Sequence, residues 1–91
     1  MASSVVKMPY KITEKTISLS SLSWTASGLY FATYPSFTAV GKVVAIVLTS
    51  WSSINQTPTL SINSSGKLVV GMPTNSAPTS GSIGVRITEL L

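Results

Sequence analysis

The stretch GKVVAIVLTSW, residues 41–51, is the most apolar run in the chain and is the segment that decides the fold. Its Val and Ile residues branch at the β carbon and suit the pleated surface of a strand. Side chains alternate between the two faces of a strand, so this run predicts a strand that is apolar on both faces. The two sets are Val44, Ile46 and Leu48 on one face, and Val43, Ala45 and Val47 on the other.

Both faces of such a strand must pack against other parts of the protein or against a neighbouring subunit. The first set is bulky and suits the core, whereas the second set is smaller and suits the close approach of another sheet. Either a further layer of the same chain covers the second set, or a neighbouring subunit does. A chain of 91 residues has few residues left for a third layer. We therefore favour a subunit interface at Val43, Ala45 and Val47, because a long exposed apolar strand would favour aggregation.

The segments on either side also alternate with the period of two that is typical of strands. Residues 16–24 predict a strand with a bulge or bend at residues 20–21, where the alternation slips. Residues 28–34 predict an aromatic strand that ends at Pro35, because proline cannot donate to a ladder. Further strands are predicted at residues 59–63, 67–72 and 82–90.

Turn signals separate these strands. The tripeptide SSG, residues 64–66, predicts a hairpin between the strands at 59–63 and 67–72. The segment PTNSAPTSG, residues 73–81, predicts a loop. No stretch combines helical spacing with capping signals. The sequence therefore predicts an all-β fold, a small antiparallel β-sandwich (jelly-roll-like) of about six to seven strands over residues 13–91. Residues 1–12 are predicted to be an extended N-terminal arm.

The composition excludes most kinds of catalytic and metal-binding site. The chain has no cysteine, histidine or aspartate, and its only carboxylate side chains are Glu14 and Glu89. Disulfides are excluded, and acid–base catalysis and metal binding lack their usual residues. We expect a protein that is not an enzyme and that needs no metal or other cofactor. We also expect no nucleic-acid partner, since the six Lys and Arg residues are spread along the chain and are not interleaved with aromatic residues.

No segment predicts a membrane partner. The apolar run at residues 43–48 is far shorter than the roughly 20 residues of a spanning helix. The first ten residues, MASSVVKMPY, lack the apolar region of a signal peptide. We expect the chain to be used uncleaved, in the cytosol or in an assembly built there.

Four aromatic residues leave two interpretations open. Trp24, Tyr30, Tyr34 and Trp51 can stack on sugar rings, with Ser, Thr and Asn side chains bonding to the sugar hydroxyls. Alternatively, Trp24 and Tyr30 fill the core and Trp51 covers the end of a strand. The candidate ligand-binding residues are Trp51 and Tyr34.

The order of strand types along the chain resembles that of a known group of proteins. The segment TISLSSLSWTASGLYFATY is followed by VVAIVL, by the hairpin TPTLSINSSGKLVV and by the ending IGVRITEL. This pattern over residues 14–90 resembles the small β-sandwich modules that end tailed-bacteriophage fibre and spike proteins, and similar virion decoration proteins. In that group Trp24, Tyr30 and the apolar strand correspond to recurrent core features.

The resemblance implies a non-enzymatic structural protein of the bacteriophage virion: a capsid decoration protein, a head fibre, or a tail-fibre or spike module. It implies a homotrimer with the apolar strand near the threefold axis. It also implies attachment to a phage capsid or tail protein through the arm, where Val5, Val6, Met8 and Tyr10 are the candidate residues. Fibre modules follow a long shaft, whereas this chain opens at Met1 without one, which favours a short stand-alone decoration protein. The alternative is a carbohydrate- or receptor-binding tip that mediates host attachment by binding a host-surface glycan.

Overall fold

The computed structural model describes residues 9–91, which form seven strands and one short 3₁₀ helix. The elements are β1 (Tyr10–Ser18), η1 (Leu19–Ser21), β2 (Trp24–Ser27), β3 (Leu29–Thr38), β4 (Lys42–Ser52), β5 (Thr59–Ile62), β6 (Lys67–Met72) and β7 (Ser82–Leu90). All strand pairs are antiparallel. No helix within these residues is long and apolar enough to cross a membrane.

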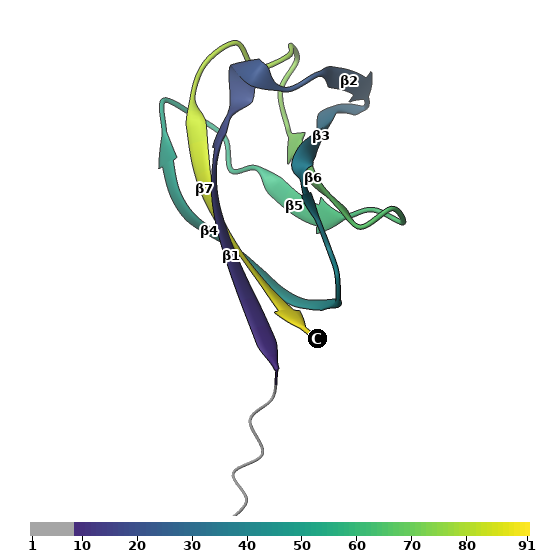
Figure 1. Cartoon of the computed structure of the whole chain (residues 1–91). Coiled ribbons are helices and arrows are strands. Elements are labelled where there is room, and N and C mark those ends of the chain that lie inside the picture. Colours follow the sequence, from purple (N-terminus) through teal and green to yellow (C-terminus); the bar gives the residue numbers. More distant parts are fainter. Residues whose placement is uncertain (1–8) are drawn as a thin grey trace, which may run out of the picture.

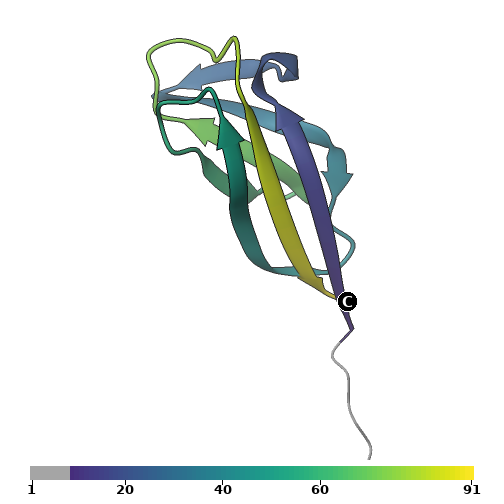
Figure 2. The same cartoon turned by 90° about the vertical axis from the view of Figure 1, so that its left-hand side faces the viewer.

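The strands form two sheets that pack as a β-sandwich, which confirms the predicted fold class (Figure 1). One sheet has three strands in the order β1-β7-β4, and the other has four in the order β2-β3-β6-β5. Figure 2 looks onto the three-stranded sheet, with β4, β7 and β1 side by side in front of the second sheet. The segments η1, 53–58 and 73–81 cross between the sheets at one end, which we name the tip. Residues 39–41 cross at the opposite end, the base.

The core lies between the sheets and is organised around β7. Ile83, Val85 and Ile87 point inward from β7 and are at most 1% exposed. They pack in one cluster with Leu68 and Val70 of β6. Burying a side chain of this size contributes about 1.5–3 kcal/mol to the free energy of folding. The alternation predicted for residues 82–90 is therefore confirmed, and it places β7 at the centre of its sheet.

The β5–β6 hairpin is also confirmed. Oδ1 of Asn63 accepts hydrogen bonds from the backbone N–H groups of Ser65 and Lys67, at 2.9 and 3.0 Å. Gly66 has a φ of 78°, a left-handed conformation that glycine adopts without steric penalty. These contacts close the turn and fix the register of the two strands.

The predicted end of the aromatic strand at Pro35 is wrong. Strand β3 continues to Thr38, and its ladder with β6 shifts register between Tyr34 and Thr38. Pro35 lies inside that irregularity, where a missing N–H removes no ladder bond. The Nζ of Lys67 donates to the carbonyl of Pro35 at 3.1 Å and to Oγ1 of Thr38. The lysine thus holds the irregular segment in place.

The predicted boundary of the arm at residue 12 is also wrong. Residues 10–12 belong to β1 and pair with residues 88–90 of β7. Val5, Val6 and Met8 lie outside the described residues, so the proposed attachment role of the arm stays a prediction. The bend predicted at residues 20–21 is confirmed, because η1 occupies it and the chain changes sheets there. Residues 16–24 are consequently not one strand.

Glu89 is a buried charge-bearing residue in the core and has no exposed surface. Its Oε2 accepts hydrogen bonds from the backbone N–H groups of Val40 and Gly41, at 2.7 and 2.9 Å. Those residues lie in the crossing from β3 to β4, so the carboxylate ties β7 to the connection between the sheets at the base. Its Oε1 is buried and makes no hydrogen bond within residues 9–91.

We expect Glu89→Ala to lower the free energy of unfolding by roughly 2–5 kcal/mol, because two part-buried hydrogen bonds lose their acceptor. Glu89→Gln keeps one acceptor oxygen and should lose less. Glu14→Ala is the matched control, since Glu14 forms an exposed ion pair with Arg86 and should change stability by about 1 kcal/mol or less. Urea unfolding of the three variants measures the ranking. Similar losses for Glu89→Ala and Glu14→Ala would contradict the role of Glu89.

Candidate functional site

The structure places β4, the apolar strand, at an edge of its sheet, and a bulge changes which side chains face outward. Val43 pairs with Glu89 and Ala45 pairs with Thr88, so Val44 is an extra residue in the ladder. An extra residue reverses the alternation beyond it. The inward residues are therefore Val43, Ile46 and Leu48, and the outward ones are Val44, Ala45 and Val47.

The assignment of Val43 to the second face of the strand is thus wrong, because Val43 packs against the core. Ala45 and Val47 do lie on the outer face, and Val44 joins them in place of Val43. Val44 and Val47 are each 47% exposed. Whether these residues form an oligomer interface is not decided by their exposure, and that role stays a prediction.

The register extends this apolar surface across all three strands. Alternation places Tyr10 and Ile12 of β1, and Leu90 of β7, on the same outer face as Val47. Tyr10 and Ile12 are 53% and 63% exposed. We name this surface the apolar outer face; it covers the base half of the sheet and consists of Tyr10, Ile12, Val44, Ala45, Val47 and Leu90. The tip half carries small hydroxyl residues instead: Thr16, Ser18, Ser50, Ser52 and Ser82.

Charges at this surface are few. Glu14 of β1 and Arg86 of β7 lie opposite each other and form an ion pair of 2.8 Å, so they neutralise one another. Lys42 stands at the base corner of the face, opposite Leu90. Ala45 and Val47 were predicted on this surface. Tyr10 was predicted only as an attachment residue of the arm, and Ile12 and Leu90 were not predicted. The alternation in YKITE and ITEL was the available signal for them.

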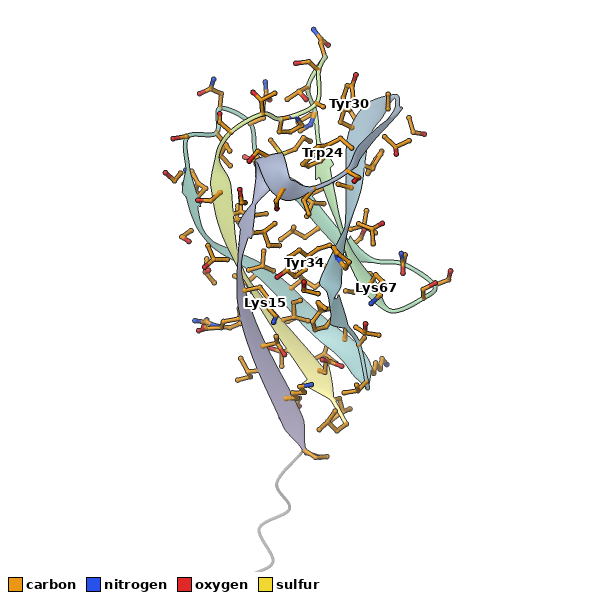
Figure 3. All side chains as sticks on the ribbon, turned by 45° about the horizontal axis from the view of Figure 1, so that its top comes forward. Lys15, Trp24, Tyr30, Tyr34 and Lys67 are labelled. Carbon is orange, nitrogen blue, oxygen red and sulfur yellow. The ribbon has the colours of Figure 1, made fainter. Side chains whose placement is uncertain are left out.

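The two edges of this sheet differ. Lys11 and Lys15 of β1 pair with Glu89 and Val85, so they lie on the inward side of their strand. Figure 3 shows Lys15 projecting from β1 toward the space between the sheets. Inward lysines on an edge strand discourage the addition of a further strand. Strand β4 has no charged residue between Val43 and Ser52, and its two bulges interrupt the regular edge instead.

A second feature, at the tip, involves Trp51. This residue is 64% exposed at the end of β4. It lines a cleft of about 190 Å³, which we name the tip cleft, together with Leu48, Ile54, Asn55, Gln56, Thr57 and Pro58. The loop that forms most of this cleft, residues 53–58, begins at Ser53 with a φ of 58°. A non-glycine residue in this left-handed region is uncommon and indicates a turn held by its surroundings.

Gly81 provides the space that this loop occupies. Its φ is 95°, and a Cβ built on it would lie 2.7 Å from Cγ2 of Ile54 and 3.0 Å from the carbonyl oxygen of Ser53. The two loops at the tip, 53–58 and 73–81, therefore touch where Gly81 has no side chain. This contact fixes the wall of the tip cleft.

Of the other candidate aromatic residues, Trp24 and Tyr34 belong to the interior, whereas Tyr30 is half-buried on β3 and is not part of the core cluster. Nε1 of Trp24 donates to the carbonyl of Leu19 at 2.8 Å, and Trp24 and Tyr34 both pack against the core (Figure 3). Tyr34 lies on β3, next to the β1 side of the sandwich, whereas Trp51 lies on β4 at the side where β4 meets β5. The structure therefore does not bring the two candidate ligand-binding residues into one site.

No catalytic constellation forms within residues 9–91. Glu14 lies on the outer face and Glu89 in the core, so the two carboxylates do not meet. No group of three or more metal-ligating side chains occurs in this part of the chain. Comparison of the chain with known protein families, curated proteins and solved structures finds no match. The function must therefore be argued from the apolar outer face and the tip cleft.

We expect Gly81→Ala to lower the free energy of unfolding by roughly 1–3 kcal/mol, because it adds backbone strain and a contact with Ile54. Gly28→Ala is the control: Gly28 also has a positive φ, of 77°, but a Cβ there would meet nothing within 4 Å. Denaturant unfolding should show the larger loss for Gly81→Ala. Equal losses would mean that the contact between the two tip loops is unimportant.

Proposed function

We propose that the chain is a non-enzymatic structural module of a bacteriophage virion that acts as a homotrimer. The observation that carries this proposal is the apolar outer face, which extends over three strands of one sheet. Such a surface is unusual on a protein that works as a monomer, and large exposed apolar patches mark interaction sites.

A second copy of the chain is the occupant that the chemistry favours. The apolar outer face offers aliphatic and tyrosine side chains, and the one ion pair beside it is already neutralised within the chain. It therefore presents no unpaired charge pattern for an oppositely charged partner to recognise, apart from Lys42 at its corner. A small domain with a net charge of +4 and no disulfide also gains stability from subunit association.

The arrangement of the strands supports packing of faces about a threefold axis. The bulges of β4 discourage the extension of its ladder by a further strand, so association through side chains is favoured over strand addition. With Ala45 and Val47 nearest the axis, β1 of one copy would lie toward β4 of the next. A head-to-tail contact of this kind closes into a ring of three when successive copies are rotated by about 120°.

The base of the sandwich suits attachment to a phage capsid or tail protein. The described chain begins at the base with β1, and Tyr10 is exposed there. Residues that precede β1 would therefore reach the virion from the base, and the tip would project away from it. In this arrangement the chain is located in the virion.

We expect native mass spectrometry to show the full chain as a trimer. We expect Val47→Lys to raise the dissociation constant of the trimer at least tenfold and so to favour the monomer. The reason is that three desolvated ammonium groups would meet near the axis. Ser61→Lys is the matched control, because Ser61 is exposed on β5, an edge strand of the other sheet.

A second variant tests the extent of the interface. Ile12→Lys should also weaken the trimer, since Ile12 belongs to the apolar outer face on β1. A wild-type chain that is monomeric at micromolar concentration, or a trimer that Ser61→Lys weakens as much as Val47→Lys, would refute the proposed association. Far-ultraviolet circular dichroism should show an unchanged sheet signal in all three variants.

A further inference from the structure

The tip cleft has the composition of a small sugar site. Trp51 provides an exposed aromatic surface, and the loop beside it provides two amides and a hydroxyl from Asn55, Gln56 and Thr57. We propose that this cleft binds one neutral pyranose ring, which stacks on the indole of Trp51. The inference goes beyond the structural role proposed above and does not depend on it.

The lining of the cleft argues for a neutral ligand. None of its residues is charged, so nothing in it would pair with a carboxylate, a phosphate or a sulfate. A sugar ring has C–H groups on its faces and hydroxyls at its rim. The indole of Trp51 suits the former, and amide and hydroxyl side chains suit the latter because each amide both donates and accepts hydrogen bonds.

The polar groups of the loop are free to make such bonds. Among residues 9–91, no hydrogen bond involves the side chain of Asn55, Gln56 or Thr57. All three residues are exposed. A sugar hydroxyl would therefore replace water at these groups without breaking a contact inside the protein.

The size of the cleft limits the ligand. Its volume of about 190 Å³ corresponds to about six water molecules at about 30 Å³ each. Sites for drug-sized molecules start at about 300 Å³. The tip cleft therefore accommodates a single ring, and further rings of a glycan would extend into solvent.

The wall of the cleft is preformed. Ser53 holds a left-handed backbone, Gly81 leaves room for Ile54, and Pro58 at the end of the loop is buried. A loop fixed in this way loses little conformational entropy when a ligand binds. The loop that lines most of the cleft, residues 53–58, lies at the tip, away from the base where β1 begins and β7 ends (Figure 1).

The test is a titration of the full chain with the methyl glycosides of glucose, galactose, mannose and N-acetylglucosamine. Binding is monitored by tryptophan fluorescence and by heteronuclear NMR. We expect at least one of them to bind with a dissociation constant of about 1 mM, a free energy of about −4 kcal/mol. The NMR shifts should centre on the Trp51 indole N–H and the side-chain amides of Asn55 and Gln56.

Matched variants make the result specific. Trp51→Ala should weaken binding at least tenfold, and Trp51→Phe should weaken it less because a smaller aromatic face remains. Tyr10→Ala is the control, since Tyr10 is an aromatic residue at the base that is 53% exposed, against 64% for Trp51. Val47→Lys should retain binding even as a monomer, which separates this inference from the proposed association.

Three outcomes would overturn the inference. The first is no binding of any of the four glycosides at concentrations up to about ten times the expected dissociation constant. The second is equal affinity in wild type and Trp51→Ala. The third is binding only of sialylated or sulfated sugars on a glycan array. Equal unfolding midpoints of wild type and Trp51→Ala would show that any loss of binding does not come from loss of the fold.

Discussion

The arrangement of the two sheets depends on the hydrogen bonds that the buried side chain of Glu89 accepts from the backbone. The chain passes from one sheet to the other through residues 39–41, where the N–H of Ala39 donates to the carbonyl of Gly66. Glu89 lies at the end of the central strand, and its Oε2 accepts hydrogen bonds from the other two N–H groups, those of Val40 and Gly41. Loss of this acceptor would leave both N–H groups without their hydrogen bonds, which lowers the stability of the fold. This contact fixes the crossing from which β4 starts, and the ladder with β7 then sets the position of β4 and of the apolar outer face.

A sandwich of this size covers each sheet on one face only. The four-stranded sheet turns a mixed surface outward, because its outward register positions hold Phe31 and Val69 as well as Thr25, Thr33 and Ser61. The three-stranded sheet instead divides its outer surface, with apolar residues at the base and small hydroxyl residues toward the tip. The two ends of the molecule therefore differ in chemistry. The base favours contact between protein surfaces, and the tip favours small polar ligands.

The local pattern predicted the fold class and most strands, because alternation and turn residues act over a few positions. Residues 67–72 and 82–90 match β6 and β7 in full. The errors arise where residues that are distant in the sequence determine the local structure. The bulge at Val44 depends on the pairing of Val43 with Glu89 and of Ala45 with Thr88, and it exchanges the faces expected for Val43 and Val44. Pro35 is accommodated by Lys67 from another strand, and residues 10–12 become a strand only by pairing with β7. Trp51 was identified from its type alone, whereas the loop that completes its cleft depends on Gly81, which is 30 residues away in the sequence.

The hydrogen bond between the N–H of Leu91 and the carbonyl of Pro9, at 2.8 Å, brings the two ends of the described chain together. A domain whose ends meet can be inserted into a surface loop of another protein without separating the strands of its host. The same fold can also be carried at either end of a longer chain and present its tip loops in the same direction. The sandwich is thus a portable unit, and the tip loops at 53–58 and 73–81 are the natural places for recombination or directed evolution to change what it displays.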